Sequence, residues 1–323
     1  MAVAAQVGNR VRAVLLSIVV ALLILSAAPA RAGVYYLTVA GLGGEPNYEQ
    51  RFTGLATELD RVFKSAGANV HVITLTGKEA TRERLNATIA KIAGEAKPGD
   101  DFVLVLIGHG SFDGVEYKFN LVGPDISGGE LATLCDRVPS KRQLIVNTTS
   151  SSGGSFAALK KAGRAVIAAT KSGTERNATV FARYWVEALE DPTADQDKNE
   201  TISALETFQY AAQKTASFYE SQKRLATEHA MFEDTGKGPP VREVSSETGE
   251  GRLVSNFTLL RLGGNLKAAN DPAKRDLLAK REQLEQEIDE LKYRKAAMPP
   301  GEYKTKLTAV LVELATIQKE LDK

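Results

Sequence analysis

The chain has 323 residues, of which 43% are hydrophobic and 25% are charged, and its formal net charge at neutral pH is +1. This balance is typical of a soluble globular protein and argues against nucleic acid as a partner. The sequence contains one cysteine, Cys135, which excludes a disulfide within the chain.

Residues 1–32 have the layout of a secretory signal peptide. Two arginines form a positive n-region, an apolar run covers 13–28, and Ala30-Arg31-Ala32 is a small-x-small cleavage pattern. The apolar run is shorter than the roughly 20 residues that span a bilayer, which favours cleavage over an uncleaved anchor. The mature chain is expected to begin at Gly33, to keep no stable membrane span and to be secreted into a bacterial periplasm, where export without disulfides is common.

Strands and helices are predicted to alternate between residues 33 and 232. Short apolar and β-branched runs predict strands at 34–41, 68–77, 100–110, 142–151 and 164–172. Between these runs, apolar residues recur at helical spacing. Strands separated by helices indicate a mostly parallel sheet with helices on both faces, which is a three-layer α/β domain. Functional sites in such sheets lie beyond the carboxyl ends of the strands.

Two segments follow the third and fourth predicted strands. Gly108-His109-Gly110 puts an imidazole at a sharp turn, and the segment 147–155 collects hydroxyls and backbone N–H groups ahead of a predicted helix. Such N–H groups can hold an anion or a reaction oxyanion. A single turn histidine has no strong meaning, but the two segments together indicate a site at one edge of the sheet.

In order and spacing, these segments resemble the caspase–legumain clan of cysteine peptidases, bacterial legumain-like members in particular. The resemblance covers about residues 34–229 and rests on LVLIGHGS and VNTTSSSGGS. It implies a caspase-like fold, in which His109 corresponds to the catalytic histidine and Ser150 takes the position of the nucleophilic cysteine. It also implies an oxyanion hole formed by the backbone N–H groups of Gly110 and Ser150.

The serine changes the expected chemistry. A thiol is partly ionised at neutral pH and is nucleophilic by itself, whereas a serine hydroxyl needs a general base in hydrogen-bond contact. By the family resemblance, the histidine acts on the leaving group and need not touch the nucleophile. Cys135 lies in a helix predicted at 130–137 and is expected to be a buried thiol. We therefore expect a catalytically degenerate peptidase homologue.

Residues 195–206, DQDKNETISALE, match the pattern of an EF-hand calcium loop. The expected ligands of Ca²⁺ are Asp195, Asp197, Asn199, the carbonyl of Thr201 and Glu206. Helical patterns flank the loop at 179–190 and 203–224. Glu200 stands where the sharp turn favours glycine. The alternative is an acidic, capped helix start in which Ser203 and Glu206 form a capping box.

The C-terminal third changes in composition. Residues 233–252 are rich in glycine, proline and charge, so 233–270 is predicted to be a linker in which 255–264 is a candidate returning strand. Beyond 271, leucine and isoleucine recur at heptad spacing in two stretches separated by Met298-Pro299-Pro300-Gly301. This pattern predicts an antiparallel helical hairpin of coiled-coil type at 271–323, with a capacity for self-association.

Three functions remain open on the sequence alone. The first is a degenerate peptidase homologue that binds a peptide or a protein partner. The second is a working hydrolase that uses Ser150 and His109. The third is a scaffold that associates through the hairpin at 271–323. Calcium is the only cofactor that the sequence predicts.

Overall fold

The structure is a computed structural model that describes residues 32–245 and 247–323. The predicted signal peptide therefore lies outside the described residues, apart from Ala32. Residues 33–323 pack together as one unit. Among the described helices, none combines the length and the apolar character that a membrane span requires.

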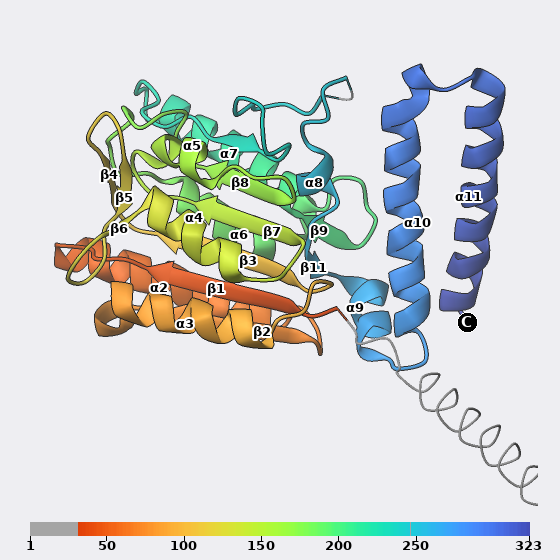
Figure 1. The fold of residues 1–323 in the computed structure, drawn as a ribbon, viewed down its shortest axis with the longest axis horizontal. Helices are drawn as coiled ribbons and strands as arrows, with labels where there is room; N and C mark the ends of the chain where they lie inside the picture. Colours follow the sequence, from red (N-terminus) through yellow and green to blue (C-terminus); the bar gives the residue numbers. More distant parts are fainter. Residues whose placement is uncertain (1–31, 246) are drawn as a thin grey trace, which may run out of the picture. The chain divides into compact units, whose positions relative to one another are not determined.

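A six-stranded sheet forms the centre of the described chain, with the strand order β10-β8-β7-β3-β1-β2 (Figure 1). Five strands run parallel, and β10 is antiparallel to β8. The strands are β1 (Val34–Ala40), β2 (Val70–Leu75), β3 (Asp101–Ile107), β7 (Arg142–Asn147), β8 (Arg164–Ala168) and β10 (Met231–Glu233). The five parallel strands coincide with the predicted ones, so the expectation of an α/β fold with a mostly parallel sheet is confirmed.

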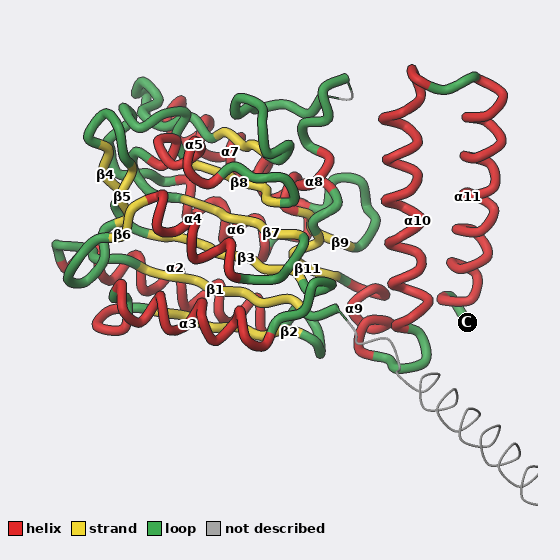
Figure 2. The backbone as a smooth tube through the Cα atoms, in the orientation of Figure 1, coloured by secondary structure: helices red, strands yellow, loops and turns green. Residues whose placement is uncertain are grey.

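Helices cover both faces of this sheet, because successive side chains of each strand point to opposite faces. Figure 2 shows helices of both groups lying along the strands. One face carries α2 (Pro46–Lys64), α6 (Phe181–Glu190) and α7 (Ala204–Ser221). The other face carries α3 (Arg82–Glu95), α4 (Gly128–Arg137) and α5 (Phe156–Leu159). Along β3, Val103 and Val105 join the first core, and Leu104 and Leu106 join the second. Burial on both sides explains why this strand is apolar without alternation.

The edge strand β10 was not predicted. The sequence favoured a helix as far as residue 224, whereas α7 ends at Ser221 and the chain returns to the sheet. Phe232 of β10 is fully buried and stands opposite Ile167 of β8. A strand of three residues is too short to produce a periodic pattern, so β10 could not be predicted from apolar periodicity.

A small three-stranded sheet lies next to the carboxyl end of β3. It consists of β4 (Gly110–Phe112), β5 (Tyr117–Phe119) and β6 (Ile126–Ser127), in the order β4-β5-β6. β5 pairs antiparallel with β4, the strand that follows His109. Tyr117 and Phe119 are buried and fix the small sheet against the main domain.

Residues 233–270, expected as a linker, pack onto the main domain. They form α8 (Arg252–Ser255), β11 (Thr258–Arg261) and α9 (Gly263–Asn270). The carboxylate of Asp234 accepts three backbone N–H groups from residues 251–254. Phe257 is fully buried, and the Tyr36 hydroxyl donates to the Leu259 carbonyl at 2.8 Å. The returning strand β11 pairs with β9 (Thr201–Ser203) of the predicted calcium loop rather than with the main sheet.

The chain ends in two helices, α10 (Arg275–Arg294) and α11 (Pro300–Leu321), which lie side by side and are joined by a short turn (Figure 1). They pack through Leu284, Ile288, Leu291 and Val310. Two hydrogen bonds of 2.7 and 3.0 Å from Arg261 to Glu282 fasten α10 to β11. The supercoiling expected of a coiled coil stays a prediction.

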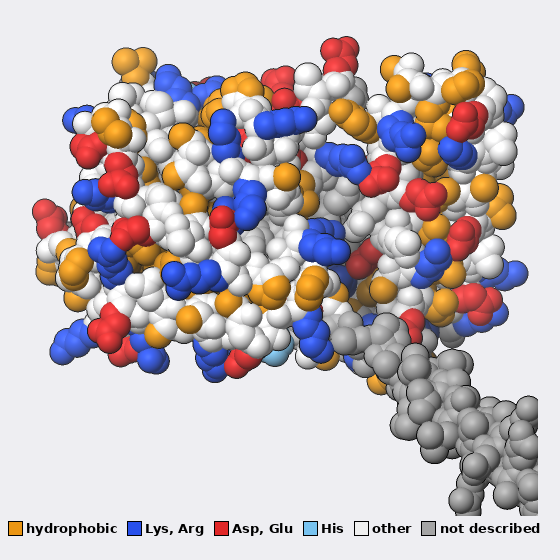
Figure 3. Space-filling model, viewed as in Figure 1, with side chains coloured by type: hydrophobic (Ala, Val, Ile, Leu, Met, Phe, Trp, Pro, Cys, Tyr) orange, Lys and Arg blue, Asp and Glu red, His pale blue; other side chains and the backbone are white. Residues whose placement is uncertain are grey.

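The surface drawn in Figure 3 carries acidic and basic side chains interspersed over the main domain and the terminal helices. This mixture fits a net charge of +1.

The buried segment around Phe257 can be tested by truncation. Phe257→Ala is expected to lower the free energy of unfolding by about 3–5 kcal/mol, because it empties a core position. The matched control is Leu225→Ala, at a side chain that is 91% exposed, which should change stability by less than about 0.5 kcal/mol. Urea unfolding of the mature chain measures both, and equal stabilities would contradict a packed 233–270 segment.

Candidate functional site

The two glycine- and hydroxyl-rich segments lie at the same edge of the sheet. In the parallel pairing of β3 with β7, Leu106 stands opposite Asn147, so both strands end side by side. Gly108 has φ of 148°, which allows the sharp turn before His109. The structure thus brings the GHG turn and the loop at 147–155 into contact.

Ser150 is held against the turn by two hydrogen bonds to one residue. Its Oγ donates to the Gly110 carbonyl at 3.0 Å and accepts from the Gly110 N–H at 3.1 Å. The side chain is almost entirely buried, with 3% of the residue exposed. Its proton is therefore directed at a backbone carbonyl, and the Gly110 N–H assigned to the oxyanion hole is already bound by the hydroxyl itself.

Gly110 is required for this approach. A Cβ atom at this position would lie 2.6 Å from the Ser150 carbonyl oxygen and 2.6 Å from Thr149 Oγ1. Both are closer than any real carbon side chain comes, and the first belongs to the backbone. The absence of a side chain at Gly110 is thus the condition for the contact between the two loops.

His109 and Ser150 follow the neighbouring strands β3 and β7, but the ring of His109 turns toward α2. The imidazole packs edge-on against Tyr48 and Phe52, with centroid distances of 4.6 and 5.1 Å. Burial lowers the pKa of His109, and a hydrogen bond with the Gly43 backbone acts in the opposite direction. Among the described residues, the Ser150 hydroxyl is hydrogen-bonded to Gly110 and not to His109. The neutral ring is therefore not in place to take the serine proton.

The remaining hydroxyls of the loop bind one another. The Tyr117 hydroxyl lies 2.7 Å from Thr149 Oγ1, and Asn147 Nδ2 donates to Ser155 Oγ at 3.1 Å. Burial raises the pKa of Tyr117 well above its usual range. Ser151 has a left-handed backbone, with φ of 56°, and its buried Oγ has no hydrogen-bond partner among the described residues. Most hydrogen-bonding groups of the loop are thus satisfied by one another.

Sequence reasoning missed a histidine–carboxylate pair near this loop. The Glu175 carboxylate lies 2.5 Å from His229 Nδ1 and also accepts the backbone N–H groups of Lys171 and His229. The Glu175 carbonyl accepts from the Ser151 N–H at 2.8 Å. The two partners are 54 positions apart in sequence, so no local pattern could have joined them. Lys171 is therefore part of a hydrogen-bonded loop, and its side chain also pairs with Glu175 at 3.7 Å.

The predicted calcium loop brings three of its five expected ligands together. One carboxylate oxygen from each of Asp195, Asp197 and Glu206 lies within 4.8 Å of the others. Burial and the charges of Glu206 and Asp195 raise the pKa of Asp197. Asn199 Oδ1 instead accepts hydrogen bonds from Thr201. The three acids therefore form a compact anionic cluster of the kind that a divalent cation neutralises.

Glu200 adopts the conformation that the loop needs at this position. Its φ is 61°, in the left-handed region that glycine enters without steric cost. Its carboxylate accepts from the Asn265 N–H at 3.1 Å, in the first turn of α9. A negative charge is favourable at a helix N-terminus. The acid thus replaces glycine in the turn and serves α9 as an acceptor. Ser203 and Glu206 form the capping box of α7 that belongs to the alternative interpretation of this segment.

Cys135 is fully buried in α4, and burial raises the pKa of its thiol to about 11. A thiol in this state carries no thiolate at neutral pH and is inert. Cys135 is therefore not a candidate nucleophile.

No protein-family model matches this chain, and no curated protein matches it. Similar solved structures include the Drosophila initiator caspase Dronc, at 11% identity and a TM-score of 0.41, covering 65% of this chain and 82% of that chain. They also include caspase-1 from Spodoptera frugiperda, at 13% identity and 0.44, covering 64% and 86%. A protein from Geobacter sulfurreducens matches at 14% identity and 0.45, covering 72% and 100%. The likeness is distant, and values this low carry no statement about activity.

The buried environment of His109 predicts a pH-dependent stability. Because its pKa is lowered in the folded chain, the unfolded chain binds more protons below the ordinary histidine value of about 6.5. Stability should therefore fall as the pH is lowered through that range and level off above it. His109→Gln should remove this part of the slope in urea titrations between weakly acidic and neutral pH. Ser150→Ala, a non-titrating change at the same site, should retain it, and parallel wild-type and His109→Gln profiles would contradict the burial of this ring.

Proposed function

We propose that the protein is a catalytically degenerate homologue of the caspase–legumain peptidases that binds a peptide or protein partner after export. The observation that carries this proposal is the Ser150 hydroxyl, which donates a hydrogen bond to the Gly110 carbonyl and, among the described residues, contacts no side-chain base. Serine catalysis requires a base in direct contact with the hydroxyl and an orienting group behind that base. The ring of His109 is instead packed against two aromatic residues of α2.

A working hydrolase is the alternative. It would require Ser150 to leave the Gly110 backbone and His109 to leave Tyr48 and Phe52, and no interaction among the described residues would replace the lost ones. A fluorophosphonate probe separates the two proposals, because it labels only an activated serine. Labelling of wild type but not of Ser150→Ala would favour the hydrolase.

Export to a bacterial periplasm is part of the proposal and rests on the sequence of residues 1–32. The scaffold alternative is less favoured, because α10 and α11 are engaged with their own domain. Arg261 pairs with Glu282, and Leu278 and Leu321 pack with Ala268 of α9. These contacts support a clamp on the main domain, while the exposed Leu311 and Val312 of α11 keep self-association open as a proposal.

The degenerate site predicts a defined mutant series. Wild-type protein should show no turnover of a mixed peptide library, and Ser150→Cys should gain activity, because a thiolate needs less help from a base. Ser150→Ala is the matched control and should equal wild type. The buried Cys135 should contribute no background. Strong cleavage by wild type that is lost in Ser150→Ala would overturn the proposal that the site is catalytically degenerate.

We also propose that the loop at 195–206 binds Ca²⁺ through Asp195, Asp197 and Glu206, with Asn199 and the Thr201 carbonyl as the further ligands that the sequence pattern implies. The convergence of the three carboxylates supports this proposal. When bound, the ion would supply charge neutralisation and would hold the loop against β11. It has no part in the chemistry at Ser150.

Calcium binding should stabilise the folded chain by mass action, by about 2.7 kcal/mol when free calcium is a hundredfold above its Kd. The melting temperature of the mature protein should therefore rise in millimolar calcium compared with chelator. Asp197→Asn should reduce this rise, because it removes a ligand and a charge. Glu220→Gln, an exposed acid of α7 outside the loop, is the control and should keep it. Equal melting temperatures in calcium and chelator would leave the loop as a capped helix start.

A further inference from the structure

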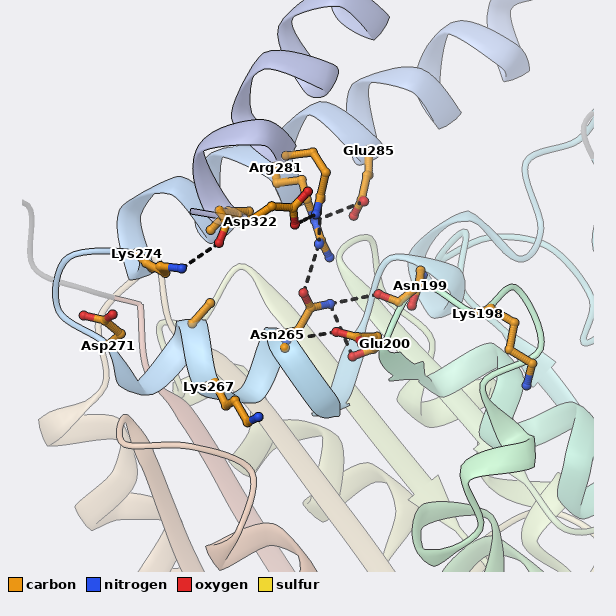
Figure 4. A pocket seen from close by; sticks show the side chains of 14 residues that line it. Lys198, Asn199, Glu200, Asn265, Lys267, Asp271, Lys274, Arg281, Glu285 and Asp322 are labelled. Carbon is orange, nitrogen blue, oxygen red and sulfur yellow. Dashed lines mark hydrogen bonds and ion pairs between the residues drawn. The ribbon is translucent and has the colours of Figure 1, made fainter.

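A buried arginine lies where the terminal helices meet the main domain. Arg281 of α10 is only 7% exposed. Its Nη1 donates to Asn265 Oδ1 at 2.9 Å and to Gln318 Oε1 at 3.2 Å, so the guanidinium plane is fixed by α9 on one side and α11 on the other. Figure 4 shows this side chain reaching from α10 toward Asn265.

The opposite edge of the same guanidinium is unsatisfied. Neither Nε nor Nη2 has a hydrogen-bond partner among the described residues. Glu285 Oε1 lies 3.3 Å from Nε, but it lacks the alignment of a hydrogen bond. A buried charged donor that lacks a hydrogen-bond acceptor costs free energy. The Nε–Nη2 edge is also the fork that matches the two oxygens of a carboxylate or phosphate.

Arg281 lines a cavity of about 610 Å³. The volume lies in the range of small-molecule sites, which is roughly 300–1,000 Å³. The walls come from the loop at 198–200, from α9, from the start of α10 and from the end of α11 (Figure 4). A ligand inside would therefore contact the main domain and both terminal helices at once.

The free groups on the wall favour a negative ligand. The acids are mostly engaged: Glu200 accepts from Asn265, Asp271 accepts from Ala273, and Asp322 accepts from Gln318. Lys274 lines the cavity and donates from Nζ to the Leu321 carbonyl, which leaves two of its three N–H donors. Arg281 and Lys274 thus both keep N–H donors that a ligand could use.

Glu285 is the one carboxylate that competes for the open edge. Its side chain is 38% exposed. Burial raises its pKa, Arg281 lowers it, and the acids Glu282, Asp197 and Asp289 raise it further. A carboxylate surrounded by other acids is a weak partner for Arg281, and an incoming anion can replace it.

We propose that this cavity binds a small molecule carrying an oxyanion group, a carboxylate or a phosphate, anchored on the Nε–Nη2 edge of Arg281 and supported by Lys274. The fixed guanidinium is preorganised, so binding loses little side-chain entropy. Because the ligand would join α9, α10 and the end of α11, binding stabilises the docked position of the terminal helices. The proposed anchors, Arg281 and Lys274, include neither Ser150 nor any of the three clustered carboxylates of the predicted calcium loop.

The test uses the mature chain in thermal unfolding at constant ionic strength, with sodium phosphate in one arm, sodium succinate in another and sodium chloride as the reference. A saturable rise in melting temperature with phosphate or succinate, and none with chloride, is expected. A rise with only one of them identifies the group that the site takes. Failure of both to exceed chloride would overturn the proposal.

Variants locate the anion. Arg281→Gln should weaken binding by about tenfold or more, because a charge-assisted bidentate contact is lost. Since Arg281 also ties α9 to α11, Lys274→Gln is measured beside it and should weaken binding by about threefold. Glu285→Gln should strengthen binding, because it removes the competing charge. Lys292→Gln, on the same helix but outside this cavity, is the control with the same change of charge and should leave affinity unchanged. Affinity that is unaffected by Arg281→Gln, or lowered by Glu285→Gln, would place the anion elsewhere.

Discussion

The candidate site depends on two parallel strands, β3 and β7, that end side by side at one edge of the sheet. Leu106 of β3 stands opposite Asn147 of β7, and both chains turn at the same edge. The next residues are then forced together, and only glycine at position 110 allows Ser150 to approach. The small sheet continues directly from this contact, because β4 starts at Gly110. Ser150 thus links the two loops. Its hydroxyl is hydrogen-bonded to the Gly110 backbone, and a catalytic hydroxyl would have to give up these hydrogen bonds.

A second junction connects the predicted calcium loop to the terminal helices. Glu200 adopts a left-handed backbone that glycine would adopt at lower cost, and its carboxylate offsets this cost by accepting from the first turn of α9. Asn265 in that turn donates to the carbonyls of Asn199 and Glu200 and accepts from Arg281. The amide side chain of Asn265 therefore connects the loop, α9 and α10 by hydrogen bonds. Ion binding in the loop and anion binding at Arg281 would share this amide, so each can influence the other through it.

The sequence was most informative where a pattern repeats over many residues. The parallel strands and the helices between them have strong apolar runs or helical spacing, and they were predicted at nearly their observed positions. The three-residue strands β9 and β10 are too short to form such a pattern, and β11 pairs with a loop 55 residues before it in the chain. The position of Ser150 and His109 at one edge followed from strand order. Their actual partners did not, because hydrogen bonds to Gly110 and ring packing on Tyr48 depend on side-chain rotamers that no spacing encodes. The same holds for His229 and Glu175, which meet only through the fold.

The hydrogen bond from Tyr36 to Leu259 joins the first strand of the sheet to one of the last segments of the main domain, across 223 positions. Tyr36 lies in β1, which is flanked by β2 and β3 inside the sheet, so an early part of the chain keeps an unfilled contact until residue 259 is available. Contacts of such high sequence separation slow folding, because loop closure must precede the gain from packing. A ribosome-bound chain that stops short of this segment lacks Phe257 and Leu259 from its core. The packing around Tyr36 is therefore completed only after residue 259 has been synthesised.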